Sequence, residues 1–365
     1  MIKNMSKNFT KNVIKKTANR IMVALLVVGL LMAFSGCGGS QYQRFQTSFI
    51  GPFDTVTLII AYTQSEAEFN RTAQILYERI NELHMLYDIF NEYDGINNLY
   101  TINKNAGIAP IEVDADIISM LLVGKEAYEL SGGAVNIAMG SVLRIWHEYR
   151  TAGAGDGARL PTYENLRKAS EITSIEDLIV DETLGTVFLR QPGMSLDVGS
   201  VAKGYAAGLV AELAKEIGLT SALLNIGGHV TTIGRPLSGN RDHWSLGIQN
   251  PDLGGAFGDS IDVVYFNDKT LSVSGGYLRF LVVDGVAYNH IIDPETLFPA
   301  NRYKQVAVIH ENSALADIIS TALFILPIEQ GLELAEKHDA KVLWIDLDGE
   351  WTATEGYAQI SRTLR

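Results

Sequence analysis

The chain has 365 residues, with 29 lysines and arginines against 42 aspartates and glutamates, a formal net charge of −13 at pH 7. The first 36 residues contain six basic residues and no acidic one, so the remainder has 23 basic and 42 acidic residues, a net charge of −19. A body this acidic argues against nucleic acid or anionic lipid as its direct ligand. Its length suits one large α/β or α+β domain, or two fused lobes.

Residues 1–36 have the composition of an export signal. Their basic residues precede an apolar run at 21–34, which is shorter than the roughly 20 residues that a bilayer-spanning helix needs. Ser35 and Gly36 then lead into Cys37, the only cysteine, so no internal disulfide is possible. The alternatives are a lipidated signal and an ordinary signal peptide or anchor helix with an incidental cysteine.

The residues before Cys37 resemble a bacterial lipobox, although Phe34 stands where leucine is usual. This resemblance implies removal of residues 1–36 and acylation of Cys37, with palmitate as a typical acyl group. The mature lipoprotein would then be anchored by lipid at the extracytoplasmic face of the cell membrane. Residues 37–50 are predicted to form a tether between the lipid and a domain at 51–365.

Periodic patterns predict mixed helices and strands in the remaining chain. The β-branched run at 55–61 predicts a strand, and residues 66–90 predict a helix with one apolar stripe. Asp114 is a suitable N-cap for a second helix, and 151–160 has a loop composition. Further strand-like runs lie at 222–226, 244–248, 262–266, 279–283, 305–309 and 341–345. Because helices and strands do not alternate regularly, the pattern favours α+β over a doubly wound sheet.

The segment 195–205 combines a loop with a predicted helix start. Free N–H groups and the positive dipole at a helix start favour a phosphate, and Lys203 adds a charge. Asp197 in the loop is predicted either to bind a ligand hydroxyl or ring N–H, or to cap the helix. The glycine pair before His229 is predicted either to let the backbone approach a ligand closely or to form a plain tight turn.

Two further segments carry candidate chemistry. His290 precedes an Asp-Pro pair at a predicted strand end. It is either a general base or a histidine with a structural role. Asp317 and Thr321 stand four apart in an apolar helix, so their oxygens share one face. A carboxylate and a hydroxyl, with water and phosphate oxygens, are typical Mg²⁺ ligands. The alternative is a first-turn acid that follows a cap at Ser313.

In this order, DVGSVAKGY (197–205), NIGGH (225–229), HIIDPET (290–296) and ADIISTAL (316–323) resemble the motifs of the ApbE-type FAD:protein FMN transferases. FDT at 53–55 and SGGAVN at 131–136 extend the resemblance over roughly 51–350. It implies a single large α+β flavin-transferase domain with mixed sheets and packed helices. It also implies protein flavinylation: Mg²⁺-dependent transfer of FMN from FAD to a Thr or Ser hydroxyl of a partner flavoprotein, with AMP leaving.

The resemblance also implies roles by position. FAD would contact Ala134, Val135, Asn136, Asp197, Lys203 and Ile291, and Phe53 and Tyr93 would flank the flavin. Mg²⁺ would be held by Ser200, Asp317 and Thr321, which makes Asp317 catalytic together with His290, the proton acceptor. The departures from the family pattern are Ser200 for glycine, Asn136 for an acid, His229 for Asp or Asn, and Leu297 for glycine, which predicts a differently built turn.

The expected partner carries the acceptor motif Asp-Gly-x-Ser/Thr-Gly-Ala-Ser/Thr. The nearest local match, at 348–354, has Trp351 and Thr352 at required positions, so self-modification is not expected. Two other functions fit the same residues. One is an FAD-binding lipoprotein without transfer, and the other is an FAD pyrophosphatase that yields FMN and AMP.

Overall fold

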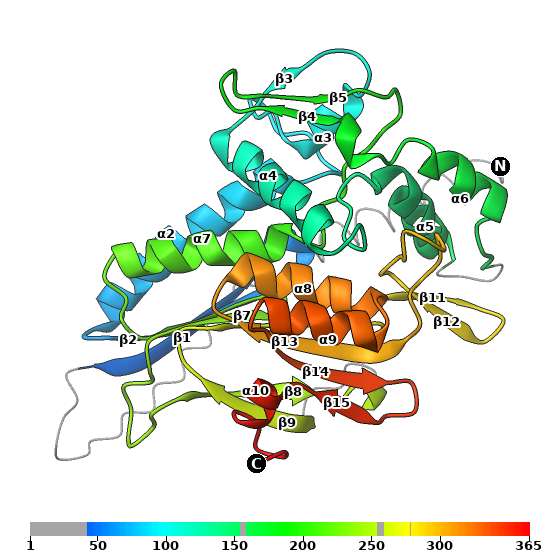
Figure 1. Cartoon of the computed structure of the whole chain (residues 1–365). Helices are drawn as coiled ribbons and strands as arrows, with labels where there is room; N and C mark the ends of the chain where they lie inside the picture. The colour runs from blue at the N-terminus through cyan, green and yellow to red at the C-terminus, as the bar shows by residue number, and fades with distance from the viewer. Residues whose placement is uncertain (1–41, 154–157, 254–258, 278) are drawn as a thin grey trace, which may run out of the picture.

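The computed structural model describes residues 42–153, 158–253, 259–277 and 279–365, and an eight-stranded sheet forms its frame (Figure 1). The strand order is β1-β2-β6-β7-β10-β13-β14-β15, and neighbouring strands are antiparallel. The strands are β1 (Gln43–Ile50), β2 (Val56–Thr63), β6 (Ala222–Ile226), β7 (His229–Ile233), β10 (Thr270–Gly275), β13 (Tyr303–His310), β14 (Lys341–Asp346) and β15 (Trp351–Ala353).

The central strands of the large sheet are buried on both faces. Helices cover one face: α2 (Glu66–Tyr87), α7 (Ala202–Glu216), α8 (Ser313–Ile325) and α9 (Ile328–Lys337). The hairpin of β8 (Trp244–Gln249) and β9 (Ser260–Phe266), with α10 (Glu355–Ala358), covers the other (Figure 1). Along β13, Val306 and Val308 belong to the helix-side core, whereas Ala307 and Ile309 belong to the opposite one. This period of two explains the unbroken apolar run at 306–309 within β13.

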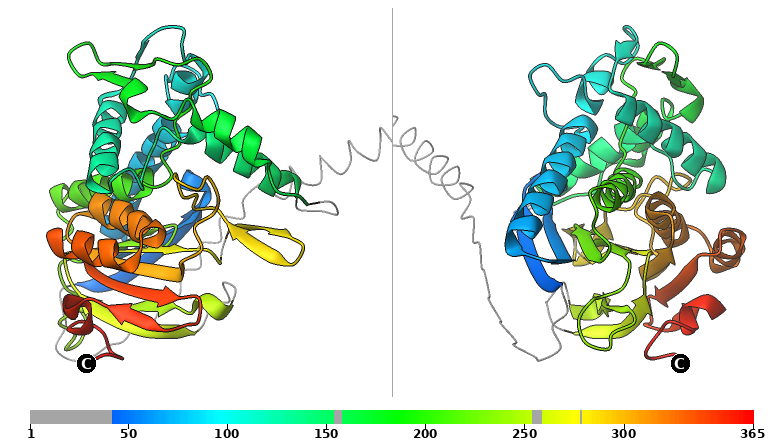
Figure 2. Two further views of the ribbon diagram at one scale, coloured as in Figure 1. Left: turned by 45° about the vertical axis from the view of Figure 1, so that its right-hand side comes forward. Right: turned by 90° about the vertical axis from the view of Figure 1, so that its left-hand side faces the viewer.

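A smaller region packs above the helices (Figures 1 and 2). Its helices are α3 (Leu99–Lys104), α4 (Ala115–Leu130), α5 (Gly140–Ala152) and α6 (Tyr163–Ser170), and its sheet has β3 (Ile111–Glu112), β5 (Thr186–Leu189) and β4 (Leu178–Asp181). The hairpin of β11 (Phe280–Val283) and β12 (Val286–Asn289) projects beside α5. Short 3-10 turns lie at η1 (Pro52–Asp54), η2 (Ile175–Asp177) and η3 (Pro251–Leu253). The α+β prediction is confirmed.

Most predicted elements are present. The strand at 55–61 is β2, the helix at 66–90 is α2, and the six later strand-like runs are β6, β8, β9, β11, β13 and β14. Asp114 caps α4 by accepting the Asp116 N–H. The helix predicted to 90 ends at Tyr87, because Asp88 turns extended and binds the N–H groups of the following loop.

The predicted tether is corrected by the structure. Residues 43–50 form strand β1, which pairs with β2 over its whole length. The sequence looks polar, but Phe45 stacks on Phe69 at 5.6 Å and Phe49 contacts Tyr77 at 4.6 Å between ring centroids, both on α2. The predicted signal at 1–36 and Cys37 lie outside the described residues. In the part of the chain that is described, no helix is long and apolar enough to span a membrane.

The C-terminus is fastened by a buried carboxylate. Asp262 on β9 is 0% exposed and accepts hydrogen bonds from Tyr357 (2.8 Å), Ser361 (2.7 Å) and Thr363 (2.9 Å from its hydroxyl). Burial acts to raise the pKa of Asp262, but these hydrogen bonds outweigh it and the pKa is lowered. The ionised Asp262 side chain therefore connects the β8–β9 hairpin to the last residues of the chain.

Candidate active site

The centre of the site is the contact between α7 and α8. The Gly204 N–H, in the first turn of α7, donates to Asp317 Oδ2 on α8 at 2.8 Å. A Cβ atom on Gly204 would lie 2.4 Å from Asp317 Cβ and 2.7 Å from the Ser313 carbonyl oxygen. Glycine is therefore required for the two helices to come this close. The N–H of Ala202 is also bonded, to the Val198 carbonyl, so the helix start is less free for phosphate than predicted.

Asp317 is held by further donors below α8. Its Oδ1 accepts from Ser272 on β10 at 3.2 Å, and Ser320 in turn contacts Ser272 at 3.1 Å. The residue is 6% exposed, so its charge is buried among hydroxyl groups. The alternative of a first-turn acid after a Ser313 cap is wrong, because Asn312 is the cap and Asp317 is bonded to α7.

His229 opens β7 and lies against the same carboxylate. It is 2% exposed, its Nε2 is 2.9 Å from Ser313 Oγ, and its Nδ1 is 3.9 Å from Asp317 Oδ1. Burial lowers the pKa of His229 to about 4, with Asp317 opposing and the Lys203 charge assisting, so the imidazole is neutral at pH 7. The preceding Gly227 and Gly228 have φ of +61° and +90° and form the tight turn that positions His229.

The predicted hydroxyl ligands flank Asp317. Thr321 lies one turn further along α8, and Ser200 just precedes α7; both are half-buried. Neither hydroxyl makes a hydrogen bond within the described segments, so both have lone pairs to offer. No three His, Cys, Asp or Glu side chains gather as a metal site among the described residues. One carboxylate with free hydroxyls fits Mg²⁺, which takes its remaining ligands from water and substrate phosphates.

The Asp197 loop lies beside the 134–136 stretch. The Asp197 N–H donates to the Ile137 carbonyl at 2.9 Å, and its Oδ1 accepts the Gly199 N–H at 3.0 Å. Asp197 thus shapes its own loop and does not cap α7, which starts after Val201. Removal from water raises the pKa of the Asp197 carboxyl, against the nearby charges of His147, Arg150 and Lys203.

The side chain of Asn136 has a structural role. Its Nδ2 donates to the Thr173 carbonyl at 3.0 Å, and its Oδ1 accepts the Ala138 N–H at 2.9 Å. Ser131 fixes the preceding residues, since its backbone oxygen accepts from Ala134 and its Oγ accepts the Val135 N–H. The stretch is therefore rigid, and its contact with FAD stays a prediction.

Two residues 40 apart in sequence, Phe53 and Tyr93, meet around His84 on α2. The ring centroids of Phe53 and His84 are 5.7 Å apart, and those of His84 and Tyr93 are 6.4 Å apart. Phe53 has a left-handed φ of 55°, and its N–H donates to His84 Nδ1 at 3.2 Å. Tyr93 is fixed by a 2.8 Å hydrogen bond to Asp88. Nothing in the sequence pattern singled out His84, which unites the two predicted flavin neighbours.

His290 directly follows the β11–β12 hairpin, as predicted for a strand end. Burial, together with the charges of Arg279, Lys203 and Arg150, lowers its pKa to about 4. The pKa of His290 therefore lies well below that of a free imidazole. The imidazole is neutral at pH 7, and its buried Nδ1 has no partner in the described structure.

The arginines near His290 carry no sequence motif, which is why sequence reasoning missed them. The next residue, Ile291, is buried, with its N–H bonded to Asn289 Oδ1 and its carbonyl oxygen to the Ala300 N–H. Leu297 beyond has φ of 62°, the left-handed conformation that favours glycine. Its carbonyl oxygen accepts the Trp146 indole N–H at 2.9 Å, which ties this turn to α5.

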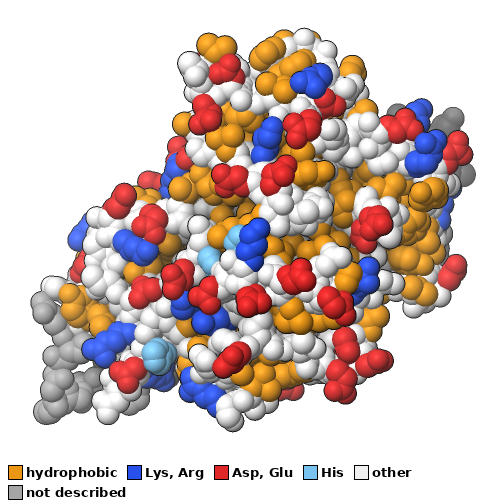
Figure 3. All heavy atoms as spheres, in the orientation of Figure 1, with side chains coloured by type: hydrophobic (Ala, Val, Ile, Leu, Met, Phe, Trp, Pro, Cys, Tyr) orange, Lys and Arg blue, Asp and Glu red, His pale blue; other side chains and the backbone are white. Residues whose placement is uncertain are grey.

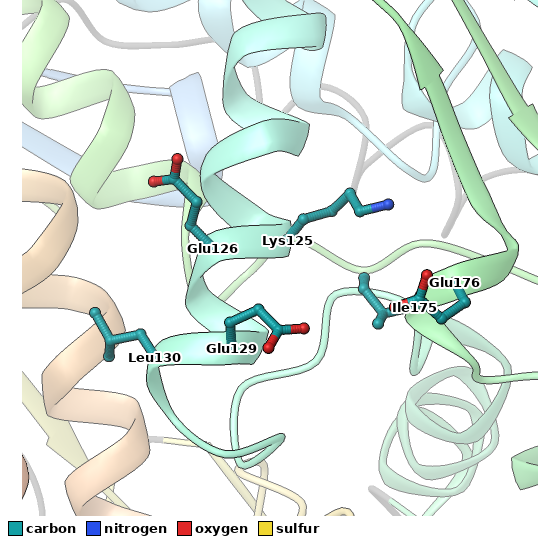
Figure 4. Close-up of a pocket in the computed structure, with 6 residues that line it drawn as sticks. All are labelled: Lys125, Glu126, Glu129, Leu130, Ile175 and Glu176. Atoms are coloured by element: carbon teal, nitrogen blue, oxygen red, sulfur yellow. The ribbon is translucent and has the colours of Figure 1, made fainter.

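Away from this site, a pocket of about 400 Å³ lies between the end of α4 and η2 (Figure 4). Its lining residues are Lys125, Glu126, Glu129, Leu130, Ile175 and Glu176. Lys125 and Glu129 point toward Ile175 and Glu176 across it (Figure 4). It shares no residue with the predicted site.

On the face shown in Figure 3, acidic and basic side chains are interspersed rather than gathered in one patch.

Known proteins resemble this chain over most of its length. The model of the ApbE family matches residues 53–344. The FAD:protein FMN transferase of Klebsiella pneumoniae (strain 342) is 30% identical over 295 residues, 79% of this chain and 85% of that protein. The one of Treponema pallidum (strain Nichols) is 30% identical over 353 residues, 93% and 95% of the two chains. The crystal structure of the ApbE protein of Thermotoga maritima superimposes with a TM-score of 0.76 at 25% identity, covering 88% of this chain and 100% of that one.

Proposed function

The chain belongs to the ApbE family, and we propose that it is an FAD:protein FMN transferase that modifies a Thr or Ser hydroxyl of another protein. Two relatives that are 30% identical bear this name. The observation that carries the proposal is the buried Asp317 carboxylate, bonded to Gly204 in the first turn of α7. The neighbouring Lys203 contributes a charge that acts on the neutral His290.

Asp317, Thr321 and Ser200 would hold Mg²⁺ against the FAD diphosphate. The bound ion would neutralise charge on the phosphoryl group that is transferred and on the leaving AMP. Asp317 is fixed for this task before any ligand arrives, because Gly204 and Ser272 orient both of its oxygens. A preorganised ligand loses little freedom on binding.

His290 would accept the proton of the attacking hydroxyl. The hydroxyl oxygen forms a bond to the FMN phosphorus, the bond between that phosphorus and the bridging oxygen breaks, and AMP leaves with that oxygen. Lys203, Arg150 and Arg279, whose charges act on His290, would offset the negative charge of the diphosphate. In return, the diphosphate would raise the basicity of His290 once FAD is bound.

The flavin would lie at the Phe53–His84–Tyr93 cluster, with Asp197 as a partner for a ligand hydroxyl or ring N–H. Aromatic rings held at fixed angles provide an apolar seat with little loss of side-chain entropy. Ala134, Val135, Asn136 and Ile291 would complete the FAD contacts through their rigid backbone.

We further propose that Cys37 is acylated and that the domain at the extracytoplasmic face acts on acceptors with the Asp-Gly-x-Ser/Thr-Gly-Ala-Ser/Thr motif. The basic and apolar composition before Cys37 supports this location.

The test is to incubate the chain from Gly38 onward with FAD, Mg²⁺ and a motif-bearing acceptor. Flavin fluorescence on the acceptor after denaturing electrophoresis, with AMP release in parallel, is the expected result. His290→Asn should bind FAD but label at least about a hundredfold more slowly, and Asp317→Asn should not label. AMP without labelled acceptor would instead identify a pyrophosphatase. Bound FAD with neither product would identify a binding protein.

A further inference from the structure

His229 places a bare nitrogen beside the proposed metal ligand. Its Nε2 is engaged by Ser313 Oγ at 2.9 Å, whereas its Nδ1 is buried and has no hydrogen-bond partner in the described structure. Asp317 Oδ1 lies 3.9 Å from Nδ1, too far for a hydrogen bond. A buried nitrogen without a hydrogen-bond partner thus lies 3.9 Å from a buried carboxylate oxygen.

This spacing suits a shared cation. Bonds from a transition ion to imidazole nitrogen and carboxylate oxygen are each about 2.1 Å, so their sum of about 4.2 Å exceeds the observed separation. The two atoms are therefore close enough to share one ion, with a wide nitrogen–metal–oxygen angle. The Ser313 hydroxyl supports this arrangement, because a hydrogen bond on the second ring nitrogen orients a ligating imidazole.

We propose that His229 is a metal ligand together with Asp317 and sets the metal preference of this site, an inference that rests on the proposed function. The ApbE-type motif has Asp or Asn at this position, which offers only oxygen to a metal. Imidazole suits Zn²⁺ and the other late transition ions, whereas carboxylate, carbonyl and water oxygens suit Mg²⁺. The site of this chain should therefore favour the transition ions more than an all-oxygen site does.

The experiment uses the metals alone, without FAD, on the chain from Gly38 onward. Mn²⁺ is added to the protein, and electron spin-echo spectroscopy detects a ¹⁴N nucleus bound directly to the ion. Calorimetry then measures the affinities for Co²⁺ and Mg²⁺. We expect nitrogen coupling in the unaltered protein, and its loss in His229→Asn and His229→Asp. The Co²⁺ affinity should fall at least about tenfold in these variants while that of Mg²⁺ changes less than about twofold.

Two histidine variants serve as matched controls. His243→Asn alters an exposed histidine that contacts Asn267, and His290→Asn alters the other catalytic-site histidine with an unpartnered nitrogen. Both should retain the nitrogen coupling. Loss of the signal in either would overturn the assignment to His229.

The outcomes separate this proposal from the function on which it rests. Mn²⁺ that binds without nitrogen coupling, in a protein that still labels its acceptor and depends on Asp317, would overturn the role of His229 alone. Metal binding that is unchanged in Asp317→Asn would overturn the metal site itself. The spectrum of the unaltered protein decides the matter even if neither His229 variant folds.

Discussion

The Gly204 N–H of α7 and the Asp317 carboxylate of α8 are joined by a 2.8 Å hydrogen bond. A helix N-terminus that commonly receives a substrate anion here receives a carboxylate of the same protein. The bond couples the position of Asp317 to the packing of two helices, so a small change at this contact should reach the proposed metal site.

Gly204→Ala should reduce both stability and activity. The new Cβ would lie 2.4 Å from Asp317 Cβ, which forces α7 and α8 apart. We expect a loss of about 1–3 kcal/mol in the free energy of unfolding in urea, as for other overpacked cores, and a loss of FMN transfer. Gly208→Ala, one turn along α7, is the matched control, because its Cβ would meet Ser313 Cβ at an ordinary 3.4 Å. Equal effects of the two variants would contradict the proposed role of the close contact.

The titration of His290 should depend on bound FAD. In the free protein its pKa is lowered to about 4. A base must be unprotonated, so kcat/KM should stay level as the pH falls from 8 to about 5, and decrease only below that. In the FAD complex, the diphosphate offsets the three cations, so the acid limb of kcat should lie at higher pH. Proton NMR, with the signal assigned by His290→Asn, measures both values. A free-protein pKa near 6.5 would refute the burial argument.

Asp262→Asn should weaken the attachment of the C-terminus. The substitution removes a charge that accepts hydrogen bonds from Tyr357, Ser361 and Thr363. We expect a loss of about 2–3 kcal/mol in the free energy of unfolding at neutral pH, since hydrogen bonds to charged groups are the strong ones. The surface carboxylate variant Asp259→Asn is the control.

This effect should also depend on pH. The folded pKa of Asp262 is lowered, so its contribution is present above the unfolded pKa and disappears as the pH falls through the folded value. The difference between the two proteins should therefore shrink below about pH 4. A difference that grows in acid would show that the carboxylate does not act in its ionised form.

His84→Leu should weaken FAD binding more than catalysis. The substitution removes the acceptor of the Phe53 N–H while retaining an apolar side chain. One hydrogen bond contributes about 0.5–1.5 kcal/mol, so the Kd for FAD should rise about twofold to tenfold, with kcat nearly unchanged. Fluorescence titration and transfer kinetics give the two values. A decrease in kcat at an unchanged Kd for FAD would show that His84 does not act through flavin binding at the Phe53–His84–Tyr93 cluster.

Cys37→Ala should release the protein from membranes or leave its signal uncut. The basis is the basic and apolar stretch that ends at this cysteine. Membrane fractionation, with mass spectrometry of the mature N-terminus, tests it. A mature chain that begins elsewhere and carries no acyl group would refute lipidation.

Elements with strong periodicity were predictable from the sequence, and β1 was not. The apolar stripe of α2 and the β-branched runs of β2 and β13 have local signals, whereas Phe45 and Phe49 become informative only once α2 lies beside them. A polar edge strand with two aromatic residues has the composition of a linker.

The same distinction applies to the site. Asp317, His290 and Lys203 belong to motifs, so they could be proposed as site residues from the sequence. Arg150, Arg279 and His84 act through three-dimensional proximity and carry no sequence pattern. The sequence does not assign a role to His229 either, since only the fold places its Nδ1 3.9 Å from Asp317 Oδ1.

The early start of β1 limits how far the domain can move from a membrane. Only six residue steps separate Cys37 from Gln43, and a fully extended chain advances at most about 3.6 Å per residue, so the reach is about 22 Å. With Cys37 acylated, the edge of the main sheet would stay within this distance of the lipid surface. Acceptors would then have to reach a domain whose sheet edge stays near the bilayer.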